Sequence, residues 1–265
     1  HADLTQKYNF ETKSKSDCEI IIHLYDHLKT IKSNIYDIIS ELCDTLDGEF
    51  AFILYDVQNK FVIFARDPFG VRPLFFDYES YSFASELKAF KSLSTVKQFP
   101  PGNFALLSDF SYLSFLFPYH HTSNTFTFDD LPNILANINS LLRHAVKKRL
   151  MSERNLCCLL SGGLDSSLIA AIVASHVPNL KTYSIGFKDS PDLYYAQQVA
   201  DHIQSDHTNI QLHHDEFINA IDTVIKSIES YDTTTVRASV GNYLVSKYIK
   251  ENSSNVVVFN GDYAD

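Results

Sequence analysis

The sequence predicts a two-domain α/β protein, in which a layered α+β domain is followed by a parallel sheet with helices on both faces. Its 265 residues are more than one hydrophobic core usually supports, which favours two domains. Early in the chain, apolar residues recur at helical spacing and then give way to short aromatic-rich runs. Beyond residue 134, helical and strand patterns alternate, which is typical of a parallel sheet.

The first domain is expected over residues 1–107. Apolar residues at helical spacing predict amphipathic helices at 19–28 and 35–46. The following runs are apolar on both faces, so they predict sheets covered by helices in a layered α+β domain. These strands are expected at residues 50–55 and 61–65, which form a hairpin, and at 73–76 and 81–84.

The second domain is expected over residues 134–265. Residues 108–133 are aromatic and rich in Ser, Thr and Asn without a clear period, which predicts a connection between the domains. Ligands of a parallel sheet bind at the carboxyl ends of its strands. The expected strands are 156–160, 182–187, 208–212 and 255–259, and the expected helices are 135–149, one after the first strand, 192–203 and two across 216–250.

Composition limits the classes of partner. The formal net charge of −10 argues against a nucleic acid or an anionic membrane surface, because both need a concentrated basic patch. The only basic cluster, Lys147-Lys148-Arg149, is interpreted as a solvated helix end. No stretch reaches the roughly 18 apolar residues that a membrane span needs, and no leader pattern begins the chain. We therefore expect a soluble protein of the cytoplasm.

Cysteines and paired histidines do not predict a metal site. The cysteines lack metal-ligand spacing and indicate a reducing compartment, and the pair at 157–158 lies in an apolar run that predicts a buried strand. His120 and His121 have no partner at ligand spacing and are expected at the surface. The four cysteines are Cys18, Cys43, Cys157 and Cys158.

The strongest chemical signal is the segment Ser161-Gly162-Gly163-Leu164-Asp165-Ser166-Ser167, which follows a predicted strand and opens a helix. A helix start directs free backbone N–H groups and a positive dipole at one point, which favours an anion. The glycines allow a phosphate to approach, the serine hydroxyls can donate to it, and Asp165 can hold Mg²⁺ on it. The alternative is an ordinary Ser/Asp helix cap after a glycine turn.

This loop resembles the pyrophosphate-binding loop of the ATP-pyrophosphatase enzymes, and the chain is similar to the glutamine-hydrolysing asparagine synthetases along nearly its whole length. Motifs in both halves carry the resemblance. They are Ser16-Asp17-Cys18-Glu19, Asp47-Gly48-Glu49-Phe50-Ala51-Phe52, Arg66-Asp67-Pro68-Phe69-Gly70-Val71-Arg72-Pro73-Leu74, Ala84-Ser85-Glu86, Tyr183-Ser184-Ile185-Gly186-Phe187, Asp189-Ser190-Pro191-Asp192-Leu193, the segment 229–239 and the segment 260–265.

The resemblance implies the fold and the chemistry together. It implies a partial amidohydrolase domain of the N-terminal nucleophile type, which takes ammonia from glutamine, and a Rossmann-like ATP-pyrophosphatase domain. The second domain would activate aspartate with ATP and Mg²⁺ as an aspartyl-adenylate, from which ammonia displaces AMP. The substrates would be aspartate, glutamine and ATP, and the full-length family would form a homodimer.

The resemblance also implies roles for individual residues. Asp17 would bind the amino group of glutamine, Asp165 would hold the metal, and Asp262 and Arg237 would be catalytic. Simpler alternatives stay open: Leu159 and Ile185 as core residues, Asp17 as a helix cap, and Arg237 as a salt-bridge partner. The implied ATP-binding residues are Leu159, Ser161, Gly162, Gly163, Asp165, Ser166, Ile185, Asn260 and Gly261.

The chain departs from the family pattern in two places. The family's N-terminal nucleophilic cysteine is absent and Cys18 is expected to be structural, so we expect a fragment that lacks the nucleophile region and the C-terminal part of the synthetase domain. Asp262 and Tyr263 stand where the family has glutamate and glycine. Two further hypotheses are therefore a non-catalytic nucleotide-binding homologue and another adenylating ligase of the same loop type.

Overall fold

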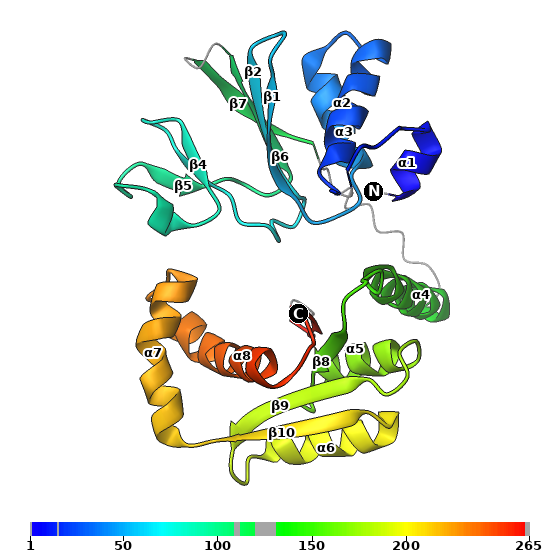
Figure 1. The fold of residues 1–265 in the computed structure, drawn as a ribbon, viewed down its shortest axis with the longest axis vertical. Helices are drawn as coiled ribbons and strands as arrows, with labels where there is room; N and C mark the ends of the chain where they lie inside the picture. The colour runs from blue at the N-terminus through cyan, green and yellow to red at the C-terminus, as the bar shows by residue number, and fades with distance from the viewer. Residues whose placement is uncertain (1, 15, 109–111, 120–130, 263–265) are drawn as a thin grey trace. The chain divides into compact units, whose positions relative to one another are not determined.

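The computed structural model describes residues 2–14, 16–108, 112–119 and 131–262. The chain forms two compact units, His1–Thr125 and Phe126–Asp265, each with its own sheets and helices (Figure 1). The two histidines at 120 and 121, and residues 263–265, lie outside the described residues.

The first unit contains two antiparallel sheets. The larger sheet has the strand order β1-β2-β6-β7 and the smaller has the order β4-β3-β5. The helices are α1 (Ala2–Tyr8), α2 (Glu19–Ile31), α3 (Ile35–Thr45) and the short 3₁₀ helix η1 (Leu87–Ala89), and the strands are β1 (Ala51–Asp56), β2 (Phe61–Arg66), β3 (Phe75–Asp77), β4 (Ser82–Ala84), β5 (Val96–Gln98), β6 (Asn103–Ser108) and β7 (Tyr112–Pro118).

Strand β2 shows why this unit is layered. Successive side chains of a strand point to opposite faces of the sheet. Ile63 and Ala65 are buried against α2 and α3 on one face, whereas Val62 and Phe64 are buried against the small sheet on the other. The layers are therefore helices, large sheet and small sheet. The predicted layered α+β arrangement is confirmed, and the hairpin predicted from strands 50–55 and 61–65 is the pairing of β1 with β2.

The predicted connection at 108–133 is wrong in part, because it contains a strand and the start of a helix. Strand β7 pairs with β6 from Asn103↔Pro118 to Ser108↔Tyr112, with a register shift between Phe104 and Leu106. The edge of the sheet supplies hydrogen-bond partners for a segment whose own pattern has no clear period. Helices α1 and η1 and strand β5 were also not expected from the pattern.

A buried carboxylate ties the first hairpin to helix α2. Asp56 accepts hydrogen bonds from the Tyr25 hydroxyl and the Asn59 side chain, both at 2.9 Å, and from the backbone of Gln58 and Asn59 at 3.0 Å. Burial acts to raise the pKa of Asp56, but the donors of Asn59 and Tyr25, with the Lys29 ammonium, outweigh it and lower the pKa well below its usual range. The negative charge therefore holds the turn against α2.

A buried pair of opposite charges organises the loop after β2. The Arg66 guanidinium donates to the carbonyl oxygens of Gly70 and Phe99 at 2.6 Å and of Arg72 at 2.7 Å. The Asp67 carboxylate accepts from three backbone amides of the same loop at 3.0 to 3.1 Å. Both side chains are almost completely buried, so their polar groups are satisfied by the backbone that they arrange.

Arg66→Lys is expected to lower the free energy of unfolding of the first unit by about 2–4 kcal/mol, because one ammonium cannot reach three carbonyl oxygens that the planar guanidinium fork bonds together. Urea unfolding of the chain measures this change. Arg72→Lys is the matched control, because the Arg72 side chain is exposed. Equal stability of the two variants would contradict the structural role of the guanidinium.

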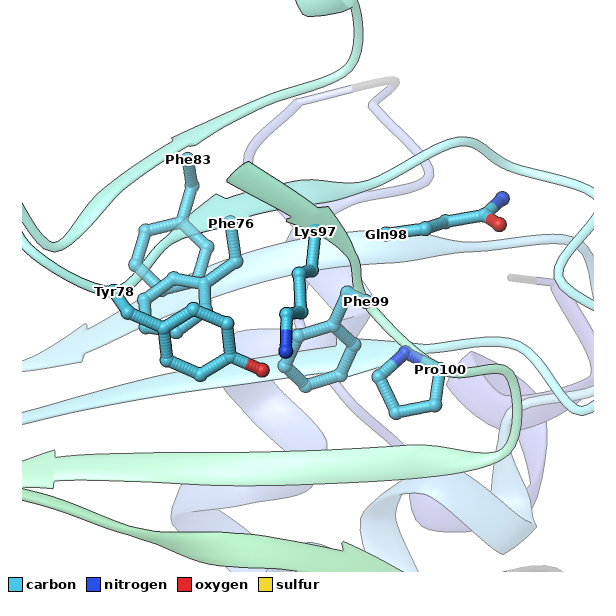
Figure 2. Close-up of a pocket in the computed structure, with 7 residues that line it drawn as sticks. All are labelled: Phe76, Tyr78, Phe83, Lys97, Gln98, Phe99 and Pro100. Carbon is cyan, nitrogen blue, oxygen red and sulfur yellow. The ribbon is translucent and has the colours of Figure 1, made fainter. Parts of the chain in front are cut away.

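The small sheet encloses a cavity of about 20 Å³. Figure 2 shows the rings of Phe76, Tyr78 and Phe83 gathered on one side of it. The Phe76 centroid lies 4.6 Å from those of Tyr78 and Phe83, and the Lys97 ammonium lies 5.3 Å from the Tyr78 centroid. A space of this size holds about one water molecule, so it is a packing feature of the small sheet.

The second unit contains a parallel sheet with the strand order β10-β9-β8-β11, as the alternating pattern predicted. Among the described residues, no helix is both long enough and apolar enough to cross a membrane. The strands are β8 (Leu156–Leu159), β9 (Lys181–Phe187), β10 (Asp206–Leu212) and β11 (Val257–Phe259), and the helices are α4 (Leu131–Arg149), α5 (Leu164–Ala174), α6 (Pro191–Ile203), α7 (His214–Ile228) and α8 (Thr233–Asn252).

Helices cover both faces of this sheet. Cys158 packs with α4, α5 and α6, whereas the adjacent Cys157 packs with Tyr183 and with α8 on the other face. Helix α8 also packs against α7 (Figure 1). The predicted arrangement with helices on both faces is therefore confirmed.

The cysteines divide by burial. Cys157 and Cys158 are buried, as the apolar run predicted, and burial raises the pKa of their thiols to about 11 and about 12. Cys43 is also buried, whereas Cys18 is exposed, so nothing supports the structural role expected of Cys18. All four cysteines are free thiols.

Candidate nucleotide-binding site

The loop from Ser161 to Gly163 lies between β8 and α5, where the sequence placed it. The Leu160 amide donates to the carbonyl oxygen of Tyr183 on β9 at 2.8 Å, which extends the strand pairing up to the loop. The chain then turns at Gly162 with φ of +82° and enters α5 through Gly163, which has extended φ and ψ. The free amides at the start of α5 therefore lie at the carboxyl end of β8.

The helix-cap alternative is wrong for this loop. The N-cap residue of α5 is Gly163, which has no side chain to cap the helix. In the described part of the chain, the amides of Leu164, Asp165 and Ser166 have no acceptor. The carboxylate of Asp165 lies in the first turn and is exposed, so it does not satisfy these donors. Unsatisfied amides at a helix start are a site for an anion.

The serine hydroxyls hold the loop in shape. The Ser161 and Ser166 hydroxyl oxygens lie 2.8 Å apart, and the Ser166 oxygen also accepts from the Ser161 amide at 3.2 Å. The Gly163 amide donates to the Ser161 hydroxyl at 3.3 Å. The Ser167 hydroxyl donates back to the Gly163 carbonyl at 2.6 Å, and the Ser166 hydroxyl makes a longer bond to the same carbonyl at 3.4 Å. Ser161 and Ser166 are thus brought together as a polar pair, whereas Ser167 closes the first turn of the helix.

The two glycines of the loop have different reasons to be glycine. A Cβ on Gly162 would lie 2.6 Å from the Ala196 nitrogen and from the Tyr195 Cβ, so helix α6 fills that space. The nearest atom to a Cβ on Gly163 is the Ser161 hydroxyl oxygen at 3.4 Å, which is an ordinary contact. Close approach of a phosphate was the expected reason for both glycines, but at Gly162 the structure shows the approach of α6 instead.

The end of β11 reaches the same loop. Gly261 lies against the backbone of Asp165 and Ser166, and the Asn260 side chain donates to the Asp262 carboxylate at 2.6 Å. The structure therefore brings the segment Asn260–Asp262 to the start of α5 through Gly261. Tyr263, the second departure from the family pattern, lies outside the described residues.

Leu159 and Ile185 share one face of the sheet. Leu159 pairs with Tyr183, two residues before Ile185 on β9, and both side chains are half-buried in the cluster of Cys157, Tyr183 and α8. They lie near the carboxyl ends of adjacent strands. Partial burial leaves a face of each side chain open, which suits the wall of a site as well as a core position.

Arg237 lies in the first part of α8 and is exposed. Across residues 2–14, 16–108, 112–119 and 131–262, it forms no hydrogen bond or ion pair, so the salt-bridge alternative is not observed. The start of α8 is capped by Asp232, which accepts from the Thr235 hydroxyl and amide, both at 2.7 Å. These donors lower the pKa of Asp232. Since α8 returns the chain to a parallel strand, its start lies on the carboxyl side of the sheet.

Asp17 lies in the first unit, next to the start of α2. The helix-cap alternative is wrong for it, because the N-cap residue is Cys18 and no side chain caps this helix. Asp17 is exposed, and its carboxylate accepts a hydrogen bond from the Cys18 thiol at 3.8 Å. Cys18 lines a groove of about 580 Å³ between α2 and the edge strand β1.

Glu19 shapes the segment that carries Asp17, and no sequence pattern predicted this role. Its carboxylate accepts from the amides of Lys13 at 2.6 Å and Ser14 at 2.7 Å. These bonds, led by that from Lys13, lower the pKa of Glu19 to about 2. A glutamate that bonds the backbone of a preceding loop lies at no fixed number of residues from that loop. The contact therefore leaves no pattern that a single sequence could reveal.

The part of α6 in the loop was also missed. Tyr195 and Ala196 press against Gly162, and α5 and α6 together line a groove of about 370 Å³ beside the loop. The small side chain of Ala196 is the only local signal of this close approach, and small residues are common in helices.

Gly162→Ala is expected to destabilise the second unit by about 3 kcal/mol, because the new Cβ meets α6 and the backbone must keep a positive φ. Gly163→Ala is the matched control and should cost about 1 kcal/mol or less, since its φ is ordinary and its Cβ has room. Denaturant unfolding of both variants tests the difference. Similar losses for both would show that α6 does not set the loop.

Comparisons with known proteins agree with the two units. Residues 137–265 match the family described as asparagine synthase, and residues 1–92 match the glutamine amidotransferase domain. All of this chain aligns with asparagine synthetase [glutamine-hydrolyzing] from Homo sapiens at 40% identity and from Mus musculus at 41% identity. It covers 51% of each, so the chain spans about half the length of these relatives.

Among solved structures, an NH3-dependent NAD synthetase from Campylobacter jejuni is similar at 18% identity with a TM-score of 0.34, over 51% of this chain and 57% of that one. This similarity is too low to carry an argument. The family matches and the curated relatives do carry one, because they cover both units of the chain. The chain belongs to the family of glutamine-hydrolysing asparagine synthetases.

Proposed function

We propose that this chain takes part in the ATP-dependent conversion of aspartate to asparagine with glutamine as nitrogen donor. One observation carries the proposal: a helix start with free amides at the end of a parallel strand, against which the segment Asn260–Asp262 is packed. The family membership of both halves supports the same reaction. We assign the glutaminase part to the first unit and the ATP-pyrophosphatase part to the second.

The second unit would bind ATP with its phosphates at the loop. The open amides at the start of α5 and the paired Ser161 and Ser166 hydroxyls are donors for phosphate oxygens. Gly163 leaves room for their approach. Leu159 and Ile185 would lie along the adenine, and the backbone at 260–261 would contact the nucleotide.

The chemistry follows from this placement. The aspartate carboxylate attacks the α-phosphorus of ATP, the bond to the β-phosphate oxygen breaks, and pyrophosphate leaves as the aspartyl-adenylate forms. The loop amides stabilise the charge on the leaving pyrophosphate. Arg237, an exposed cation on the carboxyl side of the sheet, would neutralise phosphate charge. Ammonia then attacks the acyl carbon, AMP leaves with the bonding electrons, and the Asp262 carboxylate would accept the released proton.

A magnesium ion fits this site through Asp165. Its exposed carboxylate lies in the first turn of α5 beside the proposed phosphates. The described residues hold no group of three or more His, Cys, Asp or Glu side chains suited to a metal. Mg²⁺ suits such a place, because proteins bind it through one or two carboxylates together with substrate phosphates. When bound, the ion would neutralise charge on the phosphate oxygens.

The first unit would supply the glutamine site as an amidohydrolase domain of the N-terminal nucleophile type. The Asp17 carboxylate, on the segment that Glu19 holds, would bind the ammonium group of glutamine.

The free thiols of the chain suit a reducing compartment, and we propose that the protein lies in the cytoplasm as a homodimer.

A second candidate function is nucleotide binding without catalysis, and the Asp262 contact favours it. The Asn260 amide occupies an Asp262 carboxylate oxygen at 2.6 Å, and aspartate is one methylene shorter than the family's glutamate. Pyrophosphate release from ATP that requires aspartate separates the two functions. Release with carboxyethyl-arginine, xanthylate or deamido-NAD in place of aspartate would instead indicate another adenylating ligase.

Asp262→Glu is expected to raise aspartate-dependent pyrophosphate release by up to about a hundredfold, because it moves the carboxylate by roughly one bond length toward the substrate. The rate is measured with a coupled pyrophosphate assay at saturating ATP. Asp262→Asn is the matched control, since it keeps the length and removes the charge. An unchanged rate in Asp262→Glu together with an unchanged rate in Asp262→Asn would exclude a catalytic carboxylate here.

A further inference from the structure

Gly261 makes the closest backbone contact of the segment after β11. A Cβ built on it would lie 2.6 Å from the Ser166 nitrogen, 2.8 Å from the Asp165 carbonyl carbon and 3.0 Å from the Ser166 Cα. All three are backbone atoms of the first turn of α5. A backbone inside a helical turn cannot yield as the end of a flexible side chain can, so only glycine fits here without displacement of one segment.

The Gly261 contact involves the Ser166 amide, which is a hydrogen-bond donor of the proposed anion site. Among the residues that the structure describes, the Ser166 amide is one of the amides without an acceptor at the start of α5. A methyl group at 261 would therefore cover this N–H as well as push on the turn. The absence of a side chain keeps the donor open and the segment close.

The same contact sets the position of the Asp262 carboxylate. Asp262 follows Gly261 directly and is bonded to Asn260 at 2.6 Å, so residues 260–262 form a short unit that rests on the loop through Gly261. Gly162 is held in a similar way by α6 on another side of the loop. Two close contacts at glycine therefore hold the loop and the first turn of α5. Helix α6 packs against Gly162, and Gly261 packs against Asp165 and Ser166.

We propose that Gly261 is a positioning residue, which seats the segment of Asp262 on the first turn of α5 and keeps the Ser166 amide open to a phosphate oxygen. The choice of ligand rests on the proposed function. The seating of the turn does not, because it follows from the packing of the backbone alone.

The test compares Gly261→Ala with Gly241→Ala in the full chain. Gly241 lies in α8, where a Cβ would meet nothing within 4 Å, so it is a matched control. Amide hydrogen exchange by NMR, without ligand, follows the Ser167 amide, which donates to the Gly163 carbonyl at 3.1 Å in the first turn. Calorimetry then measures the affinity for magnesium pyrophosphate.

In Gly261→Ala, the Ser167 amide should exchange about tenfold faster or more, whereas Ile172 and Val173 at the far end of α5 keep their rates. Pyrophosphate affinity should fall by about tenfold or more, because a donor to a charged group is covered. Gly241→Ala should change none of these quantities.

Three results would each contradict a proposal, and they can be told apart. Wild-type exchange at Ser167 in Gly261→Ala overturns the positioning role, whatever the ligand results are. Absence of pyrophosphate and ATP binding by the wild-type chain overturns the proposed function, while faster exchange in Gly261→Ala still supports the seating of the turn. Loss of affinity together with equal acceleration of exchange along all of α5 would show a general structural defect and also overturn the proposal.

Discussion

Strand β8 has a parallel strand on each side and helices on both faces, and the candidate site depends on this confinement. β9 and β11 fix its direction, while Cys157 and Cys158 are buried on opposite faces. These neighbours therefore fix the position of the carboxyl end of β8. The loop after β8 therefore lies at the same edge of the sheet. There, helix α5 starts with backbone amides that have no acceptor among the described residues.

The loop is organised before any ligand arrives. Ser161 and Ser166 bond each other and the backbone, so their positions do not depend on a phosphate. Preorganised donors are effective because no reorganisation is needed when negative charge develops. The chain as a whole carries a net charge of −10, so attraction of the proposed nucleotide would depend on this local arrangement of amides and hydroxyls.

The first unit solves a different problem with buried charge. Arg66 and Asp67 each satisfy several backbone groups of one loop, and Asp56 does the same for a hairpin. Each side chain replaces the regular ladder of a strand where the chain must turn. The motif Arg66-Asp67-Pro68-Phe69-Gly70, which carries part of the family resemblance, therefore has a structural explanation that is separate from catalysis.

Local sequence by itself determined most helices, most strands, the parallel sheet and the place of the loop between β8 and α5, because periodicity and the Ser-Gly-Gly-Leu-Asp-Ser-Ser segment act within short windows. Only the tertiary structure decided that β7 is a strand, since its partner β6 supplies the hydrogen bonds. It also decided why Gly162 and Gly261 are glycines. Their Cβ positions are filled by α6 and by the first turn of α5, and such contacts between distant segments leave no periodic trace in a single sequence.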